Sequence, residues 1–272
     1  MEFINEKVLL IALFILIIHS IETLAYAVRI SGARMKLIAS ALSLFNLMVL
    51  VSRLSNMVQQ PFSGSLIDTA PHTNTLEFVE NQFRVIIGAS TIGTIMGIIL
   101  LPTFMALFSR AIVHLSETKG SVPLLVKRAL TWPYFKGIFK HIHLPRWSYI
   151  VKDVRLKDIP VKLFLINMVI TAIYTIGVLS ALYASLLVPE RASTAIMASG
   201  LINGMATILL VVFVDPKISV LADDVVNKKG SYASLKAISL MMISSRLLGT
   251  LLAQVLFIPG AHYVAWFTKF IV

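Results

Sequence analysis

The sequence of 272 residues contains no cysteine. This absence excludes a disulfide framework, a thiolate metal site and a cysteine nucleophile. Acidic residues are also few, at 13, and Asp223 and Asp224 are the only two that are adjacent in the sequence. One isolated pair is a poor candidate for a metal or phosphatase site, so we predict no bound metal ion.

Motifs of common enzyme classes are missing as well. The sequence has no His-Glu-x-x-His, no Gly-x-Ser-x-Gly, no Gly-x-Gly-Asp and no Walker-type phosphate loop. We therefore predict no catalytic residues and no cofactor. If the protein moves a substrate, the energy does not come from bound ATP.

Charge is scarce throughout the chain. Only 14% of the residues are charged and 57% are hydrophobic, and the mean hydropathy is +0.86. This composition is typical of polytopic membrane proteins, and about 20 apolar residues cross about 30 Å of hydrocarbon. We predict an all-α fold with one integral membrane domain over residues 1–272 and about six transmembrane helices, at about 8–28, 37–58, 85–108, 163–188, 194–214 and 237–258.

The basic residues alternate between the two sides of the predicted spans. Three follow the first span, eleven lie in the segment 109–162, and four follow the fifth span, whereas the other side has only Lys7, Arg84, Arg191 and Lys269. Because cytoplasmic loops are enriched in Lys and Arg, we predict that both termini are extracellular. This orientation accounts for the net charge of +11, so no nucleic-acid partner is predicted.

The predicted cytoplasmic loop between spans three and four, at about 109–162, mixes basic with aromatic residues. The aromatic residues are Trp132, Tyr134, Phe135, Phe139, Trp147 and Tyr149. Such a mixture favours a segment lying on an anionic membrane surface. Two interpretations stay open: the loop is only an anchor that sets orientation, or it is a platform that gathers an anionic lipid head group.

Three charged residues fall inside predicted spans: Glu22, Arg53 and Arg246. A charge at the bilayer centre costs about 2.5 to 3.5 kcal/mol on insertion scales, so these side chains should face protein or water. The planar donor fork of arginine suits phosphate, which makes Arg53 and Arg246 candidate substrate-binding residues. Glu22 is then their counter-ion, or forms a proton-relay pair with His19.

Polar residues recur at helical spacing in four of the spans. In the first span, His19, Glu22, Thr23 and Tyr26 fall on one face of a helix. Further stripes in spans two, four and five contain the candidate substrate-binding residues Asn46, Asn167 and Asn203. The alternative is that these groups only bond helices together, at about 0.6 kcal/mol each.

Glycine and proline add expectations about packing. Gly93 with Gly97, and Gly200 with Gly204, have the small-residue spacing that allows close helix approach. Four prolines are expected at or near span ends: Pro102, Pro189, Pro216 and Pro259. Asp215, at the cytoplasmic end of span five, could pair with a loop cation.

Several stretches resemble a known family. "GLINGMATILLVVFVDPK" read on through "FVDPKIS", together with "IETLAYAVRISGAR" and "LVPERAS", is similar to the Amj family, the alternate lipid II flippases of Gram-positive bacteria. The resemblance runs the length of the chain. It implies a bacterial plasma-membrane protein that carries the undecaprenyl-diphosphate-linked peptidoglycan precursor from the inner to the outer leaflet.

The resemblance implies lipid II and membrane lipids as partners, while the residues suggest how the substrate passes. We expect the arginines to receive the diphosphate in turn, Arg246 near mid-span and Arg53 nearer the outer end, and the asparagines to bind the sugars. Six spans make a small wall for so large a head group, which suggests a homodimer. Two alternatives stay open: a gradient-driven transporter or channel for a small anionic solute, and a membrane scaffold without a transported substrate.

Overall fold

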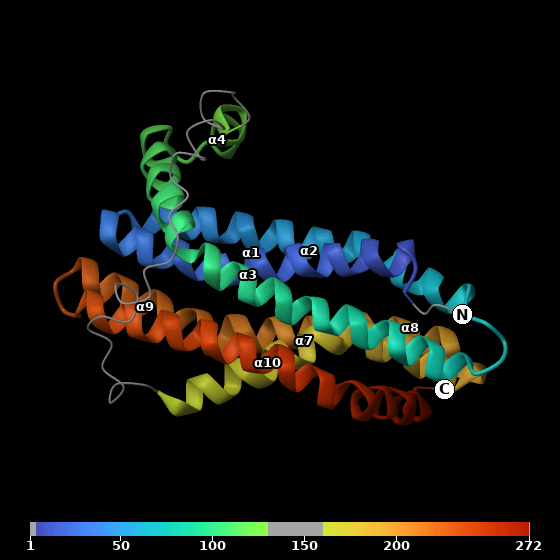
Figure 1. Cartoon of the computed structure of the whole chain (residues 1–272). Coiled ribbons are helices and arrows are strands. Elements are labelled where there is room, and N and C mark those ends of the chain that lie inside the picture. Colours follow the sequence, from blue (N-terminus) through green and yellow to red (C-terminus); the bar gives the residue numbers. More distant parts are fainter. Residues whose placement is uncertain (1–3, 130–159, 272) are drawn as a thin grey trace.

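The computed structural model describes residues 4–129 and 160–271, and these residues form a bundle of long helices (Figure 1). The first three long helices are α1 (Glu6–Met35), α2 (Ile38–Asp68) and α3 (Thr75–Glu117), and a short α4 (Val122–Ala129) follows. The second group begins with α7 (Val161–Leu187), η2 (Pro189–Arg191) and α8 (Ala192–Leu209). It continues through η3 (Leu210–Val214), α9 (Asp215–Val226), α10 (Tyr232–Phe267) and η4 (Thr268–Phe270).

Six helical segments are long and apolar enough to cross a membrane, with η2, α8, η3 and α9 counting as one span. The prediction of an all-α polytopic membrane protein with six transmembrane helices is therefore confirmed for the described residues. The helices are longer than the predicted spans because hydropathy detects only the apolar window, whereas helices continue into polar residues. Most of the predicted loop 109–162, with its six aromatic residues, lies outside the described residues.

Helix boundaries follow local chemistry. The Asn5 side chain caps α1 by accepting a hydrogen bond of 2.9 Å from the Val8 amide, and Lys36 ends the helix in the left-handed conformation. Pro102 and Pro259 do not end their helices as predicted, since both lie inside, in α3 and α10. Neighbouring helices can accommodate a proline within a membrane span, which explains the error.

The long helices form an inner and an outer set. In the apolar windows of α1, α3, α7 and α10, 44 to 61% of the residues are buried, against 22% in α2 and 17% in the α8–α9 span. The chain has two halves, the first from α1 to α4 and the second from α7 to η4. The packing pattern is the same in both: α1 packs mainly on α3 and then α2, and α7 packs mainly on α10 and then α8. The inner helices are thus a core, and α2 and α8 are attached to its sides.

Close packing between inner helices depends on glycine. A Cβ atom on Gly93 would collide with the Leu16 carbonyl, and one on Gly97 would lie 2.7 Å from the Thr23 Cβ atom. The predicted close approach is confirmed at this pair. It is wrong for Gly200 and Gly204, which face open space, because α8 turns its opposite face toward α7.

Candidate functional site

A cavity with about 50 Å³ of water-accessible space lies inside the bundle, between α1, α2, α7, α8 and α10. Its lining includes all three charged residues that the sequence places within spans, Glu22, Arg53 and Arg246. The start of α9 adds a fourth charged residue, Asp215, and Tyr26 and Tyr174 add hydroxyl groups. The cavity therefore combines an apolar wall with a few ionised groups from different helices.

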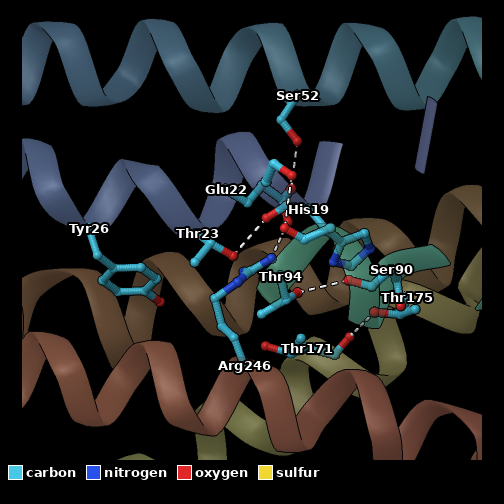
Figure 2. A network of polar contacts seen from close by, with 12 residues as sticks. His19, Glu22, Thr23, Tyr26, Ser52, Ser90, Thr94, Thr171, Thr175 and Arg246 are labelled. Atoms are coloured by element: carbon cyan, nitrogen blue, oxygen red, sulfur yellow. Dashed lines mark hydrogen bonds and ion pairs between the residues drawn. The ribbon is translucent and has the colours of Figure 1, made fainter. Parts of the chain in front are cut away.

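The centre of the site is an ion pair between Arg246 and Glu22. Arg246 Nη2 of α10 lies 2.5 Å from Glu22 Oε2 of α1, and the Ser52 hydroxyl of α2 donates a 2.6 Å bond to the other carboxylate oxygen. Figure 2 shows the carboxylate between these two donors. Since the Glu22 and Arg246 side chains are 14% and 7% exposed, each charge stabilises the other in a medium that would otherwise exclude it.

A second arginine lies on the side wall of the cavity. Arg53 of α2 donates a 2.6 Å hydrogen bond to the Thr207 hydroxyl of α8. Both residues line the cavity, so their bond crosses the gap between the two outer helices. Within the described residues, no carboxylate lies within ion-pair distance of Arg53, and its charge is available to an anionic ligand.

A second fully buried arginine was missed as a site residue. Arg29 of α1 is 3% exposed and lies 2.8 Å from Asp215 Oδ1, so the predicted pairing of Asp215 with a cation is confirmed. The cation lies inside α1, because the helix continues to Met35 and not only to the predicted end at residue 28. Arg29 follows His19, Glu22 and Tyr26 at helical spacing, and extending that stripe one step would have found it.

The predicted asparagines lie outside the cavity lining. Asn167 accepts a 3.4 Å bond from the Tyr26 hydroxyl and donates to the Ser245 hydroxyl at 2.6 Å and the Met242 carbonyl at 3.2 Å. These partners come from α1 and α10, so the amide joins three inner helices. Asn46 is on the exposed face of α2, and the Asn203 amide packs against Gly177 of α7. A role for the three in sugar binding stays a prediction.

His19 is also outside the lining. It is 2% exposed, one turn from Glu22 on α1, and Figure 2 shows its ring beside that carboxylate. Its Nδ1 atom has no hydrogen-bond partner among the described residues. Among those residues no cluster of three or more His, Cys, Asp or Glu side chains is arranged to hold a metal ion. A proton-relay role for His19 stays a prediction.

The fold and the site define a polytopic α-helical membrane protein with an ion-paired cavity at the centre of its bundle. Comparison with known sequences places it more closely. The chain belongs to the Amj family, described as "Alternate to MurJ", whose family model matches residues 14–268. It is 61% identical over 269 residues to the lipid II flippase Amj of Bacillus subtilis (strain 168), covering 99% of each chain.

No solved structure matches the chain. The family resemblance predicted from the sequence is confirmed. The match covers nearly all of the chain, so it includes every helix that lines the cavity.

Proposed function

We propose that this protein is a lipid II flippase, which carries the precursor across the plasma membrane through the cavity between its two halves. The name of its Bacillus subtilis relative supports the substrate. The observation that carries the pathway is the charge in and beside the cavity. Arg53 and Arg246 line it together with Glu22 and Asp215, and Arg29, which pairs with Asp215 from outside the lining, makes three cations against two carboxylates. This excess of positive charge favours an anionic head group.

The proposed orientation has both termini outside the cell. In Figure 1, the start of α1 and the end of α10 lie at one end of the bundle, and α4 and α9 lie at the other. The basic connections follow α1, α3 and α9, at the second end. The positive-inside preference then places α4 and α9 in the cytoplasm, so Arg29 is nearer the cytoplasm than Glu22. Arg53 is at the middle of α2 and beside Ser52, which bonds Glu22, so the expectation that Arg53 lies nearer the outer surface than Arg246 has no support in the fold.

The cavity must open for so large a substrate. Pockets of about 300 to 1,000 Å³ hold drug-sized ligands, and a disaccharide pentapeptide is larger than those. The outer helices α2 and α8 are the least buried spans, and the Arg53–Thr207 bond crosses between them. Separation of α2 from α8 would open the cavity sideways to lipid, so that the polyprenyl chain stays in the bilayer while the head group passes inside.

In this mechanism Arg246 and Arg53 bind the diphosphate in turn. Arg246 is near the middle of the bundle and must exchange its ion pair with Glu22 for one with phosphate. Arg53 has to break only its hydrogen bond to the Thr207 hydroxyl. Glu22 keeps Arg246 charged and buried between transport events. It would also prevent the diphosphate from binding irreversibly, since carboxylate and phosphate compete for the same donors.

The test is a reconstituted assay of lipid II flipping, run with and without a proton gradient. Wild-type protein should move labelled lipid II between leaflets, and Arg246→Ala should reduce the rate about tenfold or more, because one charge-assisted contact contributes about 1.5 to 3 kcal/mol. If correctly folded wild-type protein moves no lipid II but takes up a small anion, the protein is instead a solute transporter. Assembly into a homodimer stays a prediction, which the mass of the purified protein in detergent would test.

A further inference from the structure

Arg29 is held by one carboxylate and one aromatic ring. Its Nη2 atom donates to Asp215 Oδ1 at 2.8 Å, and its guanidinium carbon lies 3.9 Å from the centre of the Phe45 ring. Its Nε and Nη1 atoms are buried without a hydrogen-bond partner among the described residues. A buried cation with free donors is costly, so the side chain is better suited to a ligand with more acceptors than to Asp215 alone.

The pair lies between two separate spaces. Asp215 and Phe45 line the central cavity, whereas Arg29 lines a smaller crevice, with about 10 Å³ of water-accessible space, together with Ile38, Ser219 and other residues of α2 and α9. The crevice is at the end of the bundle that the proposed orientation places in the cytoplasm. The Arg29–Asp215 pair therefore closes the cavity on its cytoplasmic side.

Asp215 lies directly after an irregular helical turn in the fifth span. It directly follows η3, a π-helical turn in which the Asp215 amide donates to the Leu210 carbonyl five residues earlier. Pro216 follows and has no amide hydrogen to continue the normal pattern. Such turns are frequent at functional sites, and the irregular hydrogen bonding here allows α9 to tilt away from α1 once the ion pair breaks.

We propose that Arg29 and Asp215 form a cytoplasmic latch, which opens when a lipid-linked diphosphate replaces Asp215 on Arg29. This inference rests on the proposed function, since it assigns the first phosphate contact of the same pathway. The diphosphate supplies the acceptors that the guanidinium lacks. Its negative charge also repels Asp215, which moves α9 outward and admits the head group to the cavity.

Two substitutions separate the latch from a merely structural pair. Asp215→Asn and Arg29→Gln both break the ion pair, so both should open the cavity without ligand. Because the chain has no cysteine, Val49→Cys, in the cavity lining, is a single reporter for a membrane-impermeant thiol reagent added from the cytoplasmic side. We expect labelling several-fold faster in both variants than in the parent carrying Val49→Cys alone.

Ligand binding should change in opposite directions in the same two variants. Undecaprenyl diphosphate in detergent should bind Asp215→Asn about tenfold more tightly, because Arg29 no longer has to leave a carboxylate. It should bind Arg29→Gln about tenfold more weakly, since a charge-assisted contact is lost. A purely structural pair would shift both variants in the same direction.

Arg191→Gln is the matched control, because Arg191 also pairs with a neighbouring carboxylate, Glu190, but lies outside both spaces. It should leave labelling and binding unchanged. Equal binding by all variants, or labelling no faster than in the parent, would overturn the latch while leaving the proposed function intact. Failure of the wild type itself to bind undecaprenyl diphosphate would count against the proposed function and the latch together.

Discussion

In the amino-terminal half, α1 packs on α3 where Gly97 meets the Ser20 carbonyl and the Thr23 side chain. In the carboxyl-terminal half, α7 packs on α10 where Gly249 meets the Met168 carbonyl and the Thr171 side chain. Each threonine is followed three residues later by a tyrosine that lines the cavity, Tyr26 or Tyr174. Each half has three spans, so the second half has the opposite orientation to the first (Figure 1).

The difference between the halves lies in their charges. The first half contributes Glu22, Arg29 and Arg53, and the second contributes Arg246 and Asp215. The contacts Glu22–Arg246, Arg29–Asp215 and Arg53–Thr207 all join one half to the other. Glycine contacts lie at the closest helix packing within each half, and these three polar contacts at the cavity join the halves, which also share apolar clusters.

This arrangement indicates which parts can move. Close packing around glycine is lost if the helices separate, but ion pairs and hydrogen bonds can be exchanged for those of a ligand. Inverted repeats that rock against each other around a central site are one known basis of alternating access in transporters. We infer that each half moves as a unit and that the polar seam between them rearranges during transport.

The largest expected effect is on the interior of a half. Gly97→Leu and Gly249→Leu should each deplete folded protein from the membrane, because the side chain would overlap the backbone and threonine of the inner partner helix. Membrane protein levels and thermal aggregation in detergent measure the loss. Gly200→Leu is the matched control, because Gly200 faces open space. If Gly97→Leu accumulates and melts like Gly200→Leu, the halves are not packed as described.

The outcome for Gly200 shows what the sequence can and cannot predict. Hydropathy located all six spans, and charge inside them identified Glu22, Arg53 and Arg246, because both signals depend on local composition. The spacing of Gly200 and Gly204 is the same as that of Gly93 and Gly97, yet only the second pair is packed. Which face of a helix meets a neighbour depends on the whole bundle, and a single sequence does not contain that information.

The same limit explains why the sequence did not predict where the asparagines and Arg29 lie. Asn46 has the helical spacing of a cavity residue, but α2 is an outer helix and turns it to the exposed surface. Arg29 was interpreted as a loop cation because predicted spans end where hydropathy falls, whereas α1 continues to Met35. The two-half arrangement was missed too, although the spacing of Thr23 and Tyr26 recurs at Thr171 and Tyr174.

An intermediate effect is expected at the central ion pair of the seam. Arg246→Gln should destabilise the protein by about 3 kcal/mol, because it leaves Glu22 buried without its partner. Adding Glu22→Gln should recover most of that stability, since no charge is then unpaired, but it should not recover lipid II flipping. Thermal melting and the flipping assay on the two single variants and the double variant measure these separately.

Recovery of both properties in the double variant would contradict the assignment of Arg246 to the diphosphate. It would mean that the pair serves only to neutralise charge inside the bundle. Loss of stability in the double variant equal to the sum of the single losses would contradict the ion pair itself, since residues in direct contact are expected to be non-additive.

The smallest effect is expected at the lipid side of the seam, between α2 and α8. Thr207→Val removes the hydroxyl that accepts the 2.6 Å bond from Arg53, at a cost of about 0.6 kcal/mol, which is typical of hydrogen bonds between membrane helices. Because this bond must break when the cavity opens sideways, the variant should flip lipid II at least as fast as wild type. Arg53→Ala should flip more slowly, since it also removes a cation from the cavity lining. Initial flipping rates at equal protein density compare the two, with Thr207→Ser as the variant that keeps the acceptor. Equal slowing by Thr207→Val and Arg53→Ala would show that transport needs the bond intact, and the cavity would then have to open at another pair of helices.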